Sequence, residues 1–236
     1  MQAKSQLLAE KINGSAGRRG KRARITRRLP HSVRRGQILG NAVELFAEYG
    51  LTAQTRALAD ACGVSQRLLY RFFPTKAALI DEVYSSEIVG AFKAVWFVDL
   101  GDRSKPVEQR LNEFYREYYT GVLTRRWLRL FLYASLAEVD MAPAYIAAII
   151  TRMLEMIVEE SAHEIGVKLP PDRAFRHELG WTLHGAVSHL AIRRHIYRSD
   201  NPTPVEEVIA MHVRMFLASL PAALGVRRTV RKHADD

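Results

Sequence analysis

The hydrophobic positions of this chain repeat with the spacing of α-helices, and the alternating pattern of β-strands is essentially absent. In residues 33–50, VRRGQILGNAVELFAEYG, the apolar residues Ile38, Ala42, Leu45 and Phe46 fall on one side of a helix. Glycine and proline punctuate such segments, because glycine suits the position after a helix and proline suits its first turn. The pattern therefore predicts an all-α protein.

The same periodicity predicts about nine helices, of which the first three are short. We expect them near residues 33–49, 55–62, 66–73, 76–96, 106–123, 125–139, 143–166, 171–198 and 204–220. Pro106 and Pro204 are expected in the first turn of their helices, and Pro221 just beyond the last one. The helix at 76–96 is expected to run unbroken and to link two domains.

Length and composition favour a soluble globular protein. The chain has 236 residues, 48% of them hydrophobic, which is enough for a sizeable core. No apolar run approaches the ~20 residues that span a bilayer, and the N-terminus lacks the pattern of a signal peptide. Cys62 is the only cysteine, which excludes an intramolecular disulfide and a cysteine-based zinc site. We expect a cytoplasmic protein.

The net charge of +10 is concentrated at one end of the chain. Residues 1–36 contain eleven lysines and arginines and one acidic residue, Glu10, whereas the remaining 200 residues carry 24 of each kind. Such basic arms usually bind polyanions, either phosphate backbones or anionic membrane surfaces, and a merely solubilising extension is the alternative. We expect residues 1–32 to form a disordered basic arm and residues 222–236 to form a polar tail.

The segment ADACGVSQRLLYRFFPTK, residues 59–76, has the features of two short helices joined by a tight turn. Ala59 is small enough for a second helix to cross close to it. Gly63 tolerates the positive φ that the turn needs, and Ser65 is a typical N-cap for the next helix. The segment therefore predicts a helix-turn-helix.

The second helix of this motif separates an apolar face from a polar one. Leu68 and Leu69 lie on the inner face, whereas the outer face carries Gln66, Arg67, Tyr70 and Arg71. Arginine and glutamine are the side chains that bond guanine and adenine edges with two hydrogen bonds each. The outer face is therefore a candidate DNA-reading surface.

Residues 34–84 resemble the DNA-binding domain of the TetR/AcrR family of bacterial transcriptional regulators. The resemblance rests on ILGNAVELFAEYG and TRALADACGVSQRLLYRFFPTKAAL, about fifty residues in all. It implies a helix-turn-helix domain over 33–82, with the motif at about 54–73, and a helical effector-binding and dimerisation domain over 83–221. The chain departs from the family pattern at Gln54 and Leu68, where hydroxyl residues are common, and at Arg67, where a small residue or proline is usual.

The resemblance implies a homodimer that binds a pseudo-palindromic double-stranded DNA operator. By it, Tyr70 packs on or hydrogen-bonds the DNA backbone and Lys76 contacts a phosphate. A surface arginine at position 67 and a core aromatic at position 70 are the alternatives. The expected DNA-binding residues are Arg34, Thr55, Arg56, Ser65, Gln66, Arg67, Tyr70, Arg71 and Lys76.

Aromatic residues are dense in the middle helices, and at helical spacing most of them are expected in the core. The family resemblance implies that some line a largely apolar effector pocket. The candidates for this pocket are Phe114, Tyr118, Phe131 and Trp181.

The helix at 171–198 carries a stripe of histidines. A shared metal ion is disfavoured because His177 and His184 are two helical turns apart, so we expect neither a metal nor another cofactor. The stripe is expected to line a pocket or to pack on a second copy, together with the last helix; burial of the apolar surface of that helix within one monomer is the alternative. The expected dimer-interface residues are Trp181, His184, Gly185, Ser188, Val208, His212 and Phe216.

No catalytic motif stands out, because the chain lacks a G-x-S-x-G sequence, a phosphate loop and a recognisable Cys/His pairing. We therefore do not expect an enzyme, and the family resemblance implies a repressor that leaves its operator when a small, partly apolar or aromatic effector binds. An activator and an effector-independent DNA binder are alternatives. An all-helical interaction module or enzyme, with the helix-turn-helix used only for packing, is a further one.

Overall fold

The computed structural model describes residues 29–137 and 144–225, which form ten α-helices and two π-helical segments and contain no β-strand. The all-α prediction is confirmed for this part of the chain. The chain divides into two compact units, Met1–Arg34 and Arg35–Asp236, and helices α3 to α12 belong entirely to the second. The basic arm lies outside the described residues up to position 28, and so does the tail from position 226.

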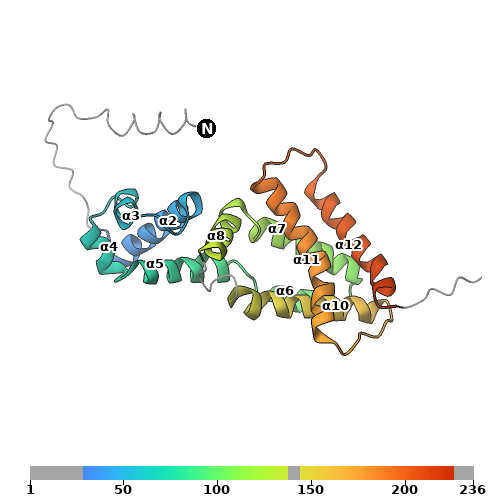
Figure 1. Cartoon of the computed structure of the whole chain (residues 1–236). Helices are drawn as coiled ribbons and strands as arrows, with labels where there is room; N and C mark the ends of the chain where they lie inside the picture. The colour runs from blue at the N-terminus through green and yellow to red at the C-terminus, as the bar shows by residue number, and fades with distance from the viewer. Residues whose placement is uncertain (1–28, 138–143, 226–236) are drawn as a thin grey trace, which may run out of the picture. The chain divides into compact units, whose positions relative to one another are not determined.

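Four helices open the described chain (Figure 1): α2 (His31–Tyr49), α3 (Thr55–Ala61), α4 (Gln66–Phe72) and α5 (Lys76–Val83). The apolar stripe of α2 is buried, and α3 packs against α4. The buried side chains of this group include Ile38, Ala42, Phe46, Leu58, Leu69, Phe73 and Leu79. Their burial fixes the orientation of α4, so its polar residues point outward.

Local signals at the turn and caps of the helix-turn-helix are confirmed. Gly63 has a φ of +62°, and the turn is closed by a 3.0 Å hydrogen bond from the backbone N–H of Val64 to the carbonyl of Ala59. The Oγ of Ser65 accepts a 3.2 Å hydrogen bond from the N–H of Leu68 at the start of α4. Such a cap satisfies one of the N–H groups that have no partner inside the helix.

The expected unbroken helix at 76–96 is wrong. Helix α5 passes into the π-helical segment η1 (Tyr84–Val89), the chain then turns, and α6 (Val95–Gly101) is a separate helix. At the turn, the N–H of Gly90 donates to the carbonyl of Ser85 at 3.0 Å, and the ring of Phe92 packs edge-on against that of Trp96, with centroids 5.2 Å apart. A helical hydrophobic period does not reveal this bend, because the aromatic residues continue the pattern.

The remaining helices pack around one another. Helix α10 packs on α11, α7 packs on α12, and α11 also packs on α8 and α12. Figure 1 shows α11 and α12 side by side, joined by the loop at the top of the view. The elements are α7 (Val107–Gly121), α8 (Arg125–Leu136), η2 (Ile146–Ile150), α10 (Thr151–Glu164), α11 (Arg173–His195) and α12 (Val205–Ala223).

Three prolines test the predicted helix ends. Pro106 and Pro204 stand one residue before the helices, as N-caps of α7 and α12. Pro221 lies inside α12, so the prediction that it follows the helix is wrong. Because proline has no N–H, Pro221 makes no hydrogen bond to the carbonyl four residues earlier, and α12 ends two residues later at Ala223.

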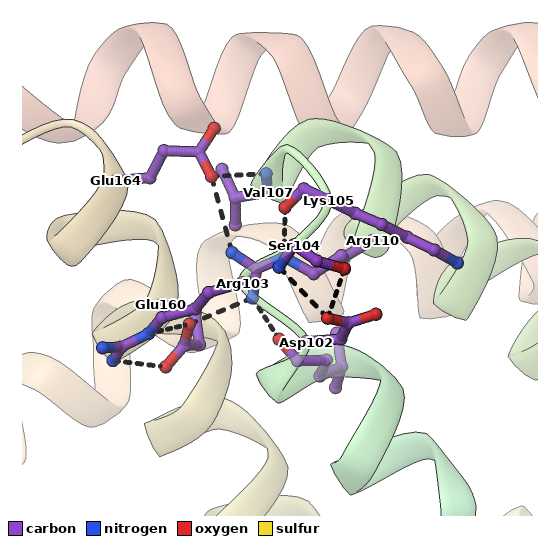
Figure 2. A network of polar contacts seen from close by, with 9 residues as sticks. Asp102, Arg103, Ser104, Lys105, Val107, Arg110, Glu160 and Glu164 are labelled. Atoms are coloured by element: carbon purple, nitrogen blue, oxygen red, sulfur yellow. Dashed lines mark hydrogen bonds and ion pairs between the residues drawn. The ribbon is translucent and has the colours of Figure 1, made fainter.

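A buried arginine joins the segment between α6 and α7 to α10 (Figure 2). Arg110 is only 3% exposed, and its Nη1 lies 3.0 Å from Oε2 of Glu160. Its Nη2 lies 3.4 Å from Oε2 of Glu164, and its guanidinium also donates to the carbonyls of Leu100 and Lys105. The sequence alone does not single out this arginine, because a charged residue on an amphipathic helix is usually exposed.

Candidate nucleic-acid interface and cavity

Helix α4 presents the outer face that the sequence predicts. Gln66, Arg67, Tyr70 and Arg71 are all exposed, whereas Leu69 is buried. The four exposed residues stand at positions i, i+1, i+4 and i+5, so they share one side of the helix. A rigid, buried inner face thus holds two arginines and a glutamine in the solvent.

Tyr70 connects α4 to the start of α3. Its hydroxyl donates a hydrogen bond to Oγ1 of Thr55 over 3.2 Å, and the residue is 41% exposed. The structure therefore brings two predicted DNA-binding residues together. The exposure of Tyr70 excludes the alternative of a core aromatic.

The other predicted DNA-binding residues lie at helix starts. Ser65 uses an oxygen lone pair for its cap, which leaves its hydroxyl hydrogen free to donate. Lys76 is the first residue of α5, where the positive end of the helix dipole disfavours a cation, and Arg34 lies in the second turn of α2. Lys76 and Arg34 are both partly exposed.

Cations of this region lack anionic partners. Within the described residues, Arg56, Arg67, Arg71 and Lys76 form no ion pair and no side-chain hydrogen bond. By contrast, Arg35 pairs with Glu82 at 2.8 Å, and its hydrogen bond holds the pKa of that carboxyl below its usual value. The unpaired cations leave positive charge uncompensated, which is the pattern of a polyanion-binding surface.

A cavity of about 120 Å³ lies among α7, α8, η2 and α11. Most of its lining is aliphatic or aromatic, with a few hydroxyl groups and one imidazole. The lining residues are Tyr118, Leu123, Trp127, Leu128, Phe131, Leu132, Tyr145, Ile146, Ile150, Trp181, His184, Ser188 and Ile192.

Three of the four predicted pocket residues, Tyr118, Phe131 and Trp181, line this cavity. Phe114 does not: it packs beneath Tyr118, with ring centroids 5.4 Å apart, and edge-on against Trp96. Phe114 and Tyr118 share a face of α7 at a spacing of four residues, so sequence periodicity does not distinguish the wall from the layer behind it.

The polar groups of the cavity are uncharged. His184 is fully buried, and burial lowers its pKa to about 3. Its Nε2 lies 3.4 Å from Oγ of Ser188, and its Nδ1 has no hydrogen-bond partner in the described part of the chain. The hydroxyls of Tyr118 and Tyr145 lie 3.5 Å apart, and burial raises the pKa of Tyr145 to about 12.

Helix α8 contacts both the cavity and α2. Trp127 and Phe131 line the cavity, and their rings stack with centroids 4.7 Å apart. On the other side of α8, Arg126 pairs with Glu44 at 3.0 Å, and Arg129 donates to the carbonyls of Ala47 and Glu48 at the end of α2. Sequence reasoning missed this connection, because it depends on residues about 80 positions apart.

Residues expected at the dimer interface divide into two groups. Trp181, Gly185, Ser188, Val208 and His212 are partly exposed on α11 and α12. His184 and Phe216 are 3% and 5% exposed, so both side chains are covered by other residues of the same protomer. Large apolar residues that the sequence did not single out are exposed on the same helices, namely Phe175, Met211 and Met215.

The described residues contain neither a metal-ligand cluster nor a membrane-spanning helix. None of their histidine, cysteine and carboxylate groups gather in a cluster of three or more that is able to hold a metal ion. None of their helices combines the length and the apolar character that crossing a bilayer requires.

Comparisons with known proteins agree with this geometry. Residues 38–83 match the family described as bacterial regulatory proteins, tetR family. The chain is 35% identical over 77 residues to the HTH-type transcriptional repressor KstR2 of Rhodococcus jostii (strain RHA1). That alignment covers 31% of this chain and 38% of KstR2, so the chain matches well under half of the relative's length.

Solved structures match more of the chain. A TetR-like transcriptional regulator from Rhodococcus sp. RHA1 has a TM-score of 0.61 at 18% identity, covering 83% of this chain and 99% of that one. AmtR of Mycobacterium smegmatis has a TM-score of 0.56 at 25% identity, covering 85% of this chain and 98% of that one. The helices after α5 therefore follow a fold seen in regulators of this kind.

Proposed function

We propose that this chain is a regulator of the tetR family, whose model matches residues 38–83, and that it is a sequence-specific DNA-binding transcriptional regulator and not an enzyme. The observation that carries the proposal is the exposed face of α4, where Arg67 and Arg71 have no partner within the described residues. The resemblance to a repressor supports repression as the sign of regulation. Activation and effector-independent binding are the alternatives.

On the operator, α4 lies in the major groove and the helix starts contact the backbone. Arg67 is positioned to bond a guanine edge, and Gln66 an adenine edge. Ser65 and Lys76 contact phosphates, since they combine available donors with positions at the rim of the motif, whereas Tyr70 packs on the DNA backbone while its hydroxyl donates to Thr55. A partner copy places a second α4 one helical turn of DNA away, which matches a pseudo-palindromic operator.

Release of DNA is coupled to the cavity through α8. A ligand that displaces Trp127 or Phe131 also moves Arg126 and Arg129, which hold the end of α2. A ligand that binds more tightly to the conformation unable to fit DNA lowers the affinity for DNA. Bound DNA lowers the affinity for the ligand by the same coupling free energy. The single helix expected over residues 76–96 does not transmit this motion as one rigid element, because it is interrupted after Val89.

A phosphate contact by Lys76 predicts a specific salt effect. Replacing Lys76 by alanine is expected to weaken binding to all duplexes about equally. It also reduces the slope of log affinity against log salt by about 2, since each protomer of a dimer loses one contact worth about 0.9. The measurement is DNA titration by fluorescence anisotropy at several salt concentrations.

The matched control is Lys168→Ala, which removes an exposed lysine from the loop before α11. An unchanged slope is expected for this variant. Equal slopes for the Lys76 variant and the wild-type chain would contradict the phosphate contact.

The dimer interface is proposed on the exposed faces of α11 and α12. Phe175 is exposed on α11, and Met211 and Met215 are exposed one helical turn apart on α12, which packs on α11; exposed apolar residues of this kind support a protein contact here. A twofold interface brings the same face of each protomer together. His184 and Phe216, buried within the protomer, support this face from behind.

Replacing Met215 by glutamate is expected to convert the dimer to a monomer at micromolar concentration. Met215 is 60% exposed on α12, and a twofold axis places two copies of the new charge in one apolar interface. Sedimentation velocity measures the change. Val98→Glu on α6, at a residue that is 69% exposed, is the control and should leave the dimer intact. A dimeric Met215 variant would argue against this interface.

A further inference from the structure

The cavity contains no charge to receive a charged ligand. None of its thirteen lining residues is an aspartate, glutamate, lysine or arginine. His184 supplies no positive charge either, because burial holds its pKa at about 3 and the ring is neutral at pH 7. Burying an ion without a partner is strongly unfavourable, so this lining selects against anions, and it offers a cation no carboxylate but only the faces of its aromatic rings.

One polar group of the cavity is left without a partner. His184 is buried, its Nδ1 makes no hydrogen bond to the described residues, and its Nε2 faces Oγ of Ser188 at 3.4 Å. A neutral imidazole has one donor and one acceptor nitrogen, and which nitrogen is which depends on the serine. A hydroxyl group on the ligand suits either case, because it both donates and accepts.

Size and shape restrict the ligand further. A cavity near 120 Å³ is on the scale of one that holds a single benzene ring. Trp127, Phe131 and Trp181 supply flat apolar walls, and the rings of Trp127 and Phe131 are nearly parallel. Such walls favour a ring over a flexible chain.

We propose that the cavity binds a small, uncharged, single-ring compound that carries a hydroxyl group, with His184 as the residue that recognises this hydroxyl. The proposal deepens the proposed function and rests on it, since it names the chemical class of the effector. Larger ligands of the same class require the lining side chains to move.

Four probes of similar size separate charge from hydrogen bonding: phenol, toluene, benzoate and benzylamine. Binding to the full-length protein is measured by calorimetry or by the fluorescence of Trp127 and Trp181 at pH 7. We expect phenol to bind at least tenfold more tightly than toluene, benzoate or benzylamine, with millimolar affinity or better. Benzoate or benzylamine binding as tightly as phenol would overturn the proposal, and so would no saturable binding of phenol.

A variant assigns the hydroxyl contact to one residue. His184→Leu is expected to remove the preference for phenol over toluene while toluene still binds. His189→Leu, at an exposed histidine of the same helix that does not line the cavity, should keep the preference. A preference retained in His184→Leu would overturn the role of His184. If that variant fails to fold, the comparison of the four probes on the wild-type chain still decides the ligand class.

DNA binding distinguishes this inference from the proposed function. If phenol binds as expected but leaves operator affinity unchanged, the proposed ligand class is supported and the proposed release of DNA by the ligand is contradicted. If an anion releases the operator while phenol does not bind, the regulator stands and the ligand class fails.

Discussion

Replacing Arg67 and Arg71 together by alanine is expected to lower affinity for the operator by about 10²–10⁴-fold. Each side chain is exposed on the outer face of α4 and unpaired within the described residues, so each is available for a base edge or a phosphate. One well-placed arginine–guanine contact is worth about 1–3 kcal/mol of discrimination. Fluorescence anisotropy with a labelled operator duplex, at one fixed salt concentration, measures the loss.

The control for this variant removes the same charge elsewhere. Arg116 and Arg214 are exposed on α7 and α12, and replacing both by alanine lowers the net charge equally. This control is expected to change affinity by less than about threefold, since its effect is limited to screened long-range attraction. An equal loss in both double variants would mean that net charge, and not the face of α4, governs binding.

The second large effect concerns stability. Replacing Arg110 by methionine is expected to lower the free energy of unfolding by about 3–5 kcal/mol, because it leaves the buried carboxylate of Glu160 without its buried partner. The carbonyls of Leu100 and Lys105 also lose their donor. Figure 2 shows these groups converging on the guanidinium of Arg110, between the α6–α7 segment and α10. Urea unfolding followed by circular dichroism measures the change.

Arg116 offers the matched control on the same helix. It is exposed and donates only to the carbonyl of Asn112 in its own helix, so Arg116→Met should change stability by less than about 0.5 kcal/mol. Arg103, which pairs with Glu160 at 2.9 Å from the exposed side, keeps part of the network in the Arg110 variant. Equal unfolding free energies for the two methionine variants would show that the buried network does not stabilise the fold.

Sequence is informative where structure depends on neighbouring residues. Ser65 and Thr75 cap helices as their types predict, and Gly63 adopts the positive φ of the turn. The outward position of Arg67 and Arg71 follows from the buried Leu69 beside them. Residue type predicts the caps and the turn, and the helical period predicts which side of α4 is exposed, so the outer face of α4 was foreseeable in outline.

Features that depend on distant contacts were not foreseeable. The burial of Arg110 needs α10 beside α7, and the bend after Val89 leaves no mark in the sequence because Phe92 and Trp96 keep helical spacing. The cavity wall is assembled from helices that are far apart in the sequence, so Tyr118 could not be distinguished from Phe114 behind it. The hydrophobic period shows that a residue lies on the core-facing side of its helix, but it does not show whether that residue lines a cavity.

The measurement that tests the central claim most directly is selection of bound DNA from a random duplex pool, with the wild-type chain and with Arg67→Ala. We expect the wild type to recover a palindromic motif whose guanine preference is lost at one position of each half-site in the variant. Recovery of no motif, with only salt-sensitive retention of DNA, would contradict sequence reading by α4.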